Sequence, residues 1–138
     1  GALCGMAADV TLVDGELTIN RMTCVIDLRQ LINPDTAHSQ VEGSIVDGLA
    51  AALYGEVTFR DGVAQQSNFN NYRFLRMADT PPIHVRLLAS GGRPGGAGEP
   101  ALPCVAPALA GAIRSAGGPR LRVLPMAAPL KTAGVTIA

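Results

Sequence analysis

The sequence predicts an α+β fold with antiparallel hairpins and two main helices. Three observations support this prediction. Asp-Gly dipeptides at residues 14–15 and 61–62 each separate two strand-like segments, which is a strong hairpin signal. A segment in the first half of the chain carries apolar residues at helical spacing. A second helix-like segment follows a glycine-rich loop in the second half.

The two hairpins are predicted on either side of the longer helix. The first pairs residues 9–13 with residues 16–27, and the second pairs residues 56–60 with residues 63–67. Their strands are rich in β-branched and apolar residues, as pleated and half-buried surfaces require.

The longer helix is predicted over about residues 36–54. Asn-Pro-Asp at residues 33–35 marks a loop followed by a helix start. One face of the helix carries apolar residues at four-residue intervals, namely Val41, Ile45, Leu49 and Leu53. Gly43 and Gly48 each lower helix propensity by roughly 1 kcal/mol, which indicates close packing against another backbone or a ligand.

The second half of the chain is predicted to contain one strand, one loop and one helix before a tail. Residues 83–89 form the strand, residues 90–100 the glycine-rich loop and residues 103–116 the helix. Residues 120–124 are expected to form a last short strand. We expect the tail, about residues 125–138, to be extended.

Composition indicates one structural unit over residues 1–138, with 48% apolar and 16% charged residues. Eleven basic residues balance eleven acidic ones, so no overall charge favours nucleic acid. The longest apolar stretch, residues 101–113, is too short and too rich in proline for a transmembrane segment.

The metal-ligating residue types lack the spacing of a metal site. The three cysteines, Cys4, Cys24 and Cys104, are far apart in sequence and form no Cys-x-x-Cys pair. We therefore expect reduced, buried thiols rather than a zinc site or a disulfide framework. His38 and His84 are also distant from each other, and no metal ligand is predicted.

Glu99 is the candidate catalytic residue. Residues 95–100 read Gly-Gly-Ala-Gly-Glu-Pro, which places one carboxylate between glycines and the start of a helix. Glycines let backbone approach a ligand closely, and prolines restrict the chain after the carboxylate. A general base held against a bound cofactor fits this pattern. An acid placed favourably for the helix dipole fits it as well.

Common catalytic motifs are absent from the glycine-rich loop. Neither a dinucleotide-binding Gly-x-Gly-x-x-Gly nor a P-loop motif aligns with residues 91–98, which disfavours a nucleotide-binding module. The polar residues at positions 38–43, including Gln40, could face a ligand at the helix start, where backbone donors suit phosphate. They could equally form a solvated first turn.

Several motifs resemble the xanthine dehydrogenase and aldehyde oxidase family. Residues 40–49, Gln-Val-Glu-Gly-Ser-Ile-Val-Asp-Gly-Leu, resemble a helix of its large, molybdopterin-binding subunit. Residues 51–56, 66–73 and 94–100 are similar to the branch that includes isoquinoline 1-oxidoreductase, as is the proline-containing helix at 103–113. The resemblance extends in one order from about Ala8 to Leu124. It implies the C-terminal part of a molybdopterin-binding domain within a larger subunit.

The chain departs from this family pattern at two places. Residues 27–30 read Asp-Leu-Arg-Gln where relatives tend to have an Asp-Cys-Gly-Arg-like stretch, so the strand end and its loop are expected to differ. Gly111 replaces an asparagine in the second helix. Glu99 and Gln40 both match the pattern.

The resemblance implies a molybdenum hydroxylase that oxidises an aldehyde or an N-heterocycle with water as the oxygen source. Glu99 would take the proton from a molybdenum-bound hydroxyl, while Gln40, Ala97 and Gly98 would contact the cofactor. The cofactor would be molybdenum-molybdopterin, in its cytosine dinucleotide form. Implied partners are the remainder of the large subunit, or a second chain carrying it, and a small subunit with iron–sulfur clusters.

A different class of function is also compatible with the sequence. A chain of 138 residues cannot form the whole cofactor cage. A non-catalytic structural or assembly domain within a multi-subunit complex is therefore the alternative.

Overall fold

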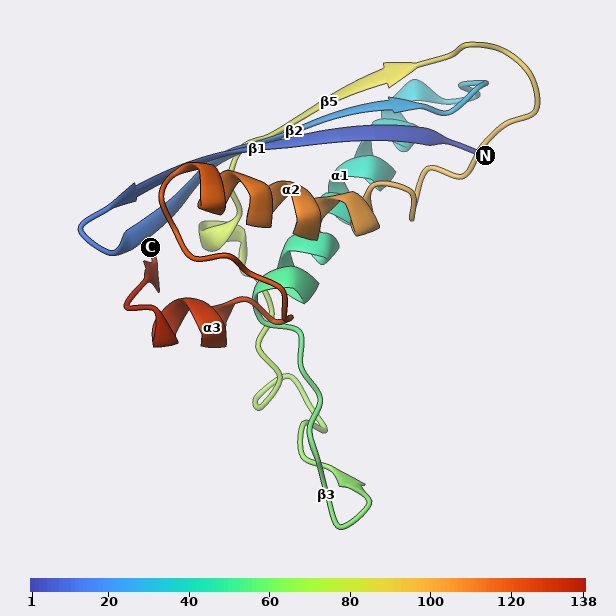
Figure 1. Cartoon of the computed structure of the whole chain (residues 1–138). Coiled ribbons are helices and arrows are strands. Elements are labelled where there is room, and N and C mark those ends of the chain that lie inside the picture. Colours follow the sequence, from blue (N-terminus) through green and yellow to red (C-terminus); the bar gives the residue numbers. More distant parts are fainter.

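A curved, four-stranded sheet forms one layer of the protein, and helices cover one of its faces (Figure 1). The computed structural model describes residues 1–138. The sheet contains β1 (Leu3–Val13), β2 (Glu16–Asp27), β5 (Ile83–Leu88) and β6 (Thr136–Ile137). The predicted α+β class is confirmed.

β2 is the central strand and pairs with all three others. It runs antiparallel to β1 around the turn at Asp14 and Gly15, whose positive φ angles of 51° and 81° are typical of tight hairpins. β5 and β6 both run parallel to β2. The first predicted hairpin is therefore confirmed, but the sheet is mixed rather than purely antiparallel.

Helix α1 (Pro34–Leu53) lies against the inner face of the sheet. The Asn33 side chain caps its start by accepting a hydrogen bond from the Thr36 N–H at 3.0 Å, and Pro34 occupies the first turn, where no intrahelical donor is lost. The predicted stripe that includes Ile45 and Leu49 is fully buried.

Helix α2 (Leu102–Ser115) packs beneath β1 and crosses α1. Its buried face carries Val105, Leu109 and Ile113. The helix ends where Gly117 adopts a φ of 91° and the Gly118 N–H donates to the Ile113 carbonyl at 2.9 Å. Both predicted main helices are confirmed.

The two helices touch at Gly48. A Cβ at this position would lie 2.7 Å from the Val105 Cγ2 and 3.0 Å from the Leu102 carbonyl oxygen. Only glycine lets the α1 backbone approach α2 this closely. Gly43, one turn earlier, faces open space instead, so close packing explains one of the two helix glycines.

The tail and the second hairpin differ from their predictions. Residues 125–138 are not extended throughout, because α3 (Ala127–Thr132) and β6 occupy most of this segment. The tail folds back because Leu130 is buried and the Met126 N–H donates to the Ala52 carbonyl at 2.8 Å. Residues 120–124 contain no strand. The second hairpin is reduced to β3 (Phe59–Arg60) and β4 (Val63–Ala64).

The hydrophobic core lies between the sheet and the helices. It is a cluster of 17 buried residues from β2, α1, α2 and the tail, and none of them is aromatic. Small and aliphatic side chains therefore provide the packing. None of the helices has the length and apolar character that crossing a membrane would require.

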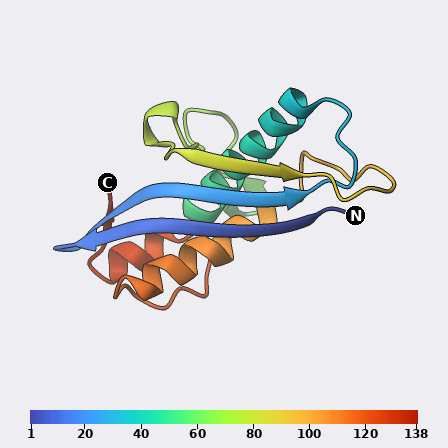
Figure 2. The ribbon, with the colours of Figure 1, turned by 90° about the horizontal axis from the view of Figure 1, so that it is seen from above.

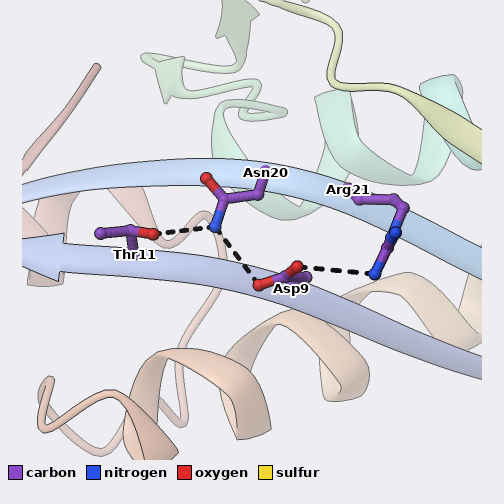
Figure 3. Close-up of polar contacts among 4 residues, drawn as sticks. All are labelled: Asp9, Thr11, Asn20 and Arg21. Carbon is purple, nitrogen blue, oxygen red and sulfur yellow. Dashed lines mark hydrogen bonds and ion pairs between the residues drawn. The ribbon is translucent and has the colours of Figure 1, made fainter.

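The outer face of the sheet is not covered by any helix (Figure 2). A polar network crosses β1 and β2 on this face, next to a bulge at Asn20 in β2 (Figure 3). Asn20 donates from Nδ2 to the Thr11 hydroxyl at 2.8 Å and to Asp9 at 3.3 Å, and Arg21 lies 3.6 Å from the other Asp9 oxygen. Exposed pairs of this kind contribute little stability.

The helix crossing leads to a paired prediction. Gly48→Ala should lower the free energy of unfolding, because overpacking costs typically about 1–3 kcal/mol and exceeds the gain in helix propensity of about 1 kcal/mol. Gly43→Ala, in the same helix but without a neighbour, should raise it by up to about 1 kcal/mol. Urea unfolding of both variants measures the difference. Equal effects of the two substitutions would contradict the close contact.

Candidate functional site

The glycine-rich loop between β5 and α2 is attached at its start to the corner that follows β2. The Gly91 N–H donates to the Arg29 carbonyl at 2.7 Å, and the Gly95 N–H donates to the Leu28 carbonyl at 2.9 Å. Leu28 in turn donates to the Leu88 carbonyl at 3.1 Å, which continues the parallel pairing of β2 and β5. The loop therefore leaves the sheet in a defined direction.

The Asp27 carboxylate is the centre of this attachment. One oxygen accepts hydrogen bonds from the Arg29 N–H at 2.9 Å and the Ser90 N–H at 3.2 Å, and the other accepts from the Ser90 hydroxyl. The Ser90 hydroxyl, with these two N–H groups, lowers the pKa of Asp27 below its ordinary value. The ionised carboxylate thus joins the ends of two parallel strands.

Arg29 adopts an unusual backbone conformation at this corner. Its φ of 69° lies in the left-handed region, which favours glycine. The resemblance led to the expectation of glycine at this position, and Arg29 adopts a φ that favours glycine. The Arg29 side chain bonds to the Ser90 hydroxyl at 3.3 Å and to the Gly1 carbonyl at 3.4 Å. These contacts are formed by a side chain that glycine lacks.

The end of the loop meets the start of α1 through Gly98 and Gln40. A Cβ on Gly98 would lie only 3.1 Å from the Gln40 Oε1, so the side-chain amide and the loop backbone are in contact. Gln40 is exposed. Two of the predicted cofactor-binding residues, 58 positions apart in sequence, are therefore neighbours in the structure.

Gln40 and Ala97 line a groove of about 250 Å³ between the loop and the start of α1. Gln30, Asn33 and Thr36 also line the groove and offer amide and hydroxyl groups. None of the lining residues is charged. The lining consists of Leu28, Gln30, Leu31, Ile32, Asn33, Thr36, Ala37, Gln40, Pro94, Gly95 and Ala97. Such a surface can hydrogen-bond a neutral heterocycle at its edge.

Glu99 follows Gly98 directly and is exposed. Its backbone carbonyl accepts a hydrogen bond from the Leu102 N–H at 3.1 Å, at the entry to α2. The two ion pairs of the chain, Arg21–Asp9 and His38–Glu42, do not involve its carboxylate. The first turn of α2 contains no acidic residue, since Glu99 lies two residues before the N-cap Ala101.

The three cysteines lie close together although they are distant in sequence, and of the three expected buried thiols only Cys24 is buried, while Cys4 and Cys104 are half-buried. The sulfur atoms of Cys4 and Cys24 are 3.6 Å apart, and Cys104 adjoins them from α2. All three are free thiols. Burial raises the pKa of both Cys4 and Cys24, which favours the thiol over the nucleophilic thiolate. No group of three or more potential ligands is placed to hold a metal ion.

Sequence reasoning missed the bond between Asp27 and Ser90. The signal was present, because Asp27 ends one strand and Ser90 follows another. Parallel pairing of these strands had not been predicted, so the two residues could not be placed together.

Comparisons with known proteins agree with this architecture. Residues 2–81 match a family model described as a molybdopterin cofactor-binding domain. The chain is 37% identical over 126 residues to isoquinoline 1-oxidoreductase subunit beta of Brevundimonas diminuta, covering 89% of this chain and 16% of that protein.

A second relative is a membrane-bound aldehyde dehydrogenase of Gluconacetobacter polyoxogenes, whose name specifies pyrroloquinoline quinone. It is 37% identical over 112 residues, which cover 81% of this chain and 14% of that protein. The crystal structure of quinoline 2-oxidoreductase from Pseudomonas putida 86 superposes with a TM-score of 0.72 at 21% identity, covering 85% of this chain and 16% of that one. This similarity confirms the fold. The chain spans about one sixth of the length of these proteins.

The Asp27 corner leads to a prediction about loop order. Asp27→Asn should speed amide hydrogen exchange of Gly91 and Gly95 several-fold, because the charged acceptor that holds Ser90 is lost. Asp9→Asn, which changes an exposed acid on the outer face of the sheet, should leave the loop unchanged. Mass-spectrometric exchange over residues 90–98 measures both.

The same corner gives a pH dependence. The pKa of Asp27 is lowered by folding, so its stabilising effect is present above the ordinary carboxyl pKa of about 4 and is lost as the pH falls through the lowered value. The difference in unfolding free energy between wild type and Asp27→Asn should therefore shrink below about pH 4. A difference that stays constant down to pH 2 would contradict this assignment.

Proposed function

The chain belongs to the family of molybdopterin cofactor-binding domains, and we propose that it forms the C-terminal part of such a domain in a molybdenum hydroxylase. The proposed enzyme oxidises an aldehyde or an electron-poor N-heterocycle with water as the oxygen source. Relatives named for isoquinoline and for aldehyde oxidation support these substrate classes. Because the chain spans about one sixth of these relatives, the remainder of the subunit, in the same or a second chain, completes the site.

The observation that carries the proposal is the contact of Gln40 with Gly98 beside an uncharged groove. A pterin presents hydrogen-bond donors and acceptors at its edge, and a side-chain amide can satisfy either kind. Gly98 leaves room at the loop backbone where a side chain would press against Gln40. Gln40, Ala97 and Gly98 would hold the cofactor at this point.

In the proposed reaction Glu99 acts as the general base. The cofactor, when bound, supplies the two-electron oxidation of the substrate carbon. Glu99 accepts the proton of the attacking water-derived oxygen, and its exposed carboxylate is available because no ion pair engages it. Hydrogen bonds at the start of the loop and at the entry to α2 hold the backbone on both sides of Glu99.

The proposed cofactor is molybdenum-molybdopterin in the cytosine dinucleotide form, with iron–sulfur clusters on a partner subunit to carry electrons away. The match to a molybdopterin-binding family supports the metal. One relative is named for pyrroloquinoline quinone instead, which makes metal analysis of the complete enzyme a direct test. Stoichiometric molybdenum is expected, and a metal-free quinoprotein would contradict the proposal.

Gln40→Ala should lower molybdenum occupancy without unfolding the domain. One neutral hydrogen bond contributes typically about 1 kcal/mol, so occupancy should fall partially. Ser39→Ala, in the same turn of α1 but outside the groove, is the control. Molybdenum content per subunit, measured after identical purification, is the readout. Unchanged molybdenum occupancy would indicate that Gln40 is only part of a solvated helix turn and does not contact the cofactor.

Glu99→Gln should give an enzyme that assembles with its full cofactor but turns over about 10² to 10⁴ times more slowly, which is the usual cost of losing a general base. The amide keeps the shape of the side chain but cannot accept the proton. Glu42→Gln, an acid on α1 outside the groove, should retain normal turnover. Turnover per bound molybdenum distinguishes the two. Wild-type turnover of fully loaded Glu99→Gln would contradict the assignment of Glu99 as general base.

A further inference from the structure

Residues 55–74 form an arm that projects from the body of the protein (Figure 1). The arm leaves the end of α1, carries the β3–β4 hairpin at its tip and returns toward β5. Unlike the tail, it is not folded back onto the sheet or the helices. It presents its surface away from the core that holds the domain together.

The aromatic residues of the chain are concentrated in this arm. All three phenylalanines, Phe59, Phe69 and Phe74, belong to it, together with Tyr72, while Tyr54 stands at its base. Phe69 is 82% exposed and Phe59 is 70% exposed. The body is packed without any phenylalanine or tryptophan. Large aromatic side chains in water are unfavourable, and clusters of them mark interaction surfaces.

The arm keeps a defined shape although it lies outside the core. The Asn71 side chain accepts hydrogen bonds from the Ser67 and Asn68 N–H groups at 3.0 Å and donates to the Gln65 carbonyl at 3.0 Å. Gln66 and Thr58 bond to each other across the base of the hairpin, through side-chain and backbone groups. A surface ordered before it binds loses less entropy on binding.

The aromatic rings also pack among themselves and onto the base of the arm. The Tyr72 and Phe74 rings meet edge to face, with their centroids 4.9 Å apart. The centroids of the Phe69 and Phe74 rings are 5.6 Å apart. The Arg73 guanidinium lies 3.7 Å from the centroid of the Tyr54 ring, which ties the returning segment of the arm to the end of α1. Together with neighbouring polar residues, Phe69 to Phe74 line an open hollow of about 770 Å³.

The chemistry of the arm fits a permanent intramolecular contact. Its two acidic residues, Glu56 and Asp61, balance its two basic residues, Arg60 and Arg73, so no net charge steers a transient partner. Obligate interfaces are apolar and resemble a divided core. The whole arm lies within residues 2–81, the part that matches the cofactor-binding family, so it is not an appended segment. About five sixths of the length of the relatives lies outside this chain.

We propose that this aromatic arm docks into the part of the same cofactor-binding subunit that lies outside residues 1–138, with Phe69 and Phe59 as its anchors. The inference rests on the proposed function, in which the chain completes its site with the remainder of that subunit. Docking of the arm would fix the C-terminal end of α1. Because Gln40 lies on the same helix, docking would also position Gln40 relative to the rest of the cofactor site.

Photo-crosslinking in the complete enzyme tests the proposal. With p-benzoylphenylalanine in place of Phe69, irradiation should join the arm to peptides of the same subunit from outside residues 1–138. The crosslinked peptides are identified by mass spectrometry. Crosslinks to an iron–sulfur subunit alone, crosslinks to the arm of a second copy, or the absence of crosslinks would each overturn it.

Phe69→Ser provides a second measurement that does not depend on crosslinking. The complete subunit should lose several degrees of thermal stability, whereas Val13→Ser, which removes another exposed apolar side chain, next to the β1–β2 turn, should change it little. Equal stability of Phe69→Ser and wild type would overturn the docking. Neither experiment reads turnover, so the arm and the role of Glu99 can fail separately.

Discussion

The close approach of α1 and α2 at Gly48 is the contact on which the candidate site depends. Gln40 lies two turns before this crossing on α1, and Glu99 lies just before the start of α2. When the helices meet at Gly48 without an intervening side chain, the start of α1 and the loop that enters α2 must come together. The contact of Gln40 with Gly98 therefore follows from the packing of two buried helices, not from any direct attraction between the two residues.

The glycine-rich loop is ordered because both of its ends are attached. Loop glycines have the largest conformational freedom in the unfolded chain, so an unattached loop of this composition would be costly to order. The ionised Asp27 and the carbonyls of Leu28 and Arg29 hold the start, and the entry to α2 holds the end. The attachment uses hydrogen bonds to backbone and hydroxyl groups and does not involve the Glu99 side chain. The Glu99 carboxylate therefore remains unpaired.

The protein separates two kinds of surface. The body packs small and aliphatic side chains tightly enough for the α1 backbone to approach α2 at Gly48, and for the loop backbone at Gly98 to contact the Gln40 side chain. The arm collects the large rings, where they contribute contact area without disturbing that packing. In our proposals, the cofactor contacts and the contacts with the remainder of the same subunit therefore belong to different elements. The end of α1, to which Arg73 ties the arm through Tyr54, connects the two.

Local chemistry in the sequence by itself determined the elements of the first part of the fold and indicated the candidate site residues. The Asp-Gly turns at residues 14–15 and 61–62 both adopt positive φ, and the stripe from Val41 to Leu53 can bury itself only as a helix, so both were predictable. Ordered motifs also placed Gln40 and Glu99 in one family.

Only the tertiary structure decided which of these elements meet. The parallel pairing of β5 with β2 joins Asp27 to Ser90 across 63 residues, and the buried Leu130 turns the expected extended tail into α3. It also decided that Gly48 is packed while Gly43 is not, and that the aromatic residues lie on a projecting arm. The physical reason is that pairing and burial depend on partners distant in sequence, whereas propensity and capping depend on neighbours a few residues away.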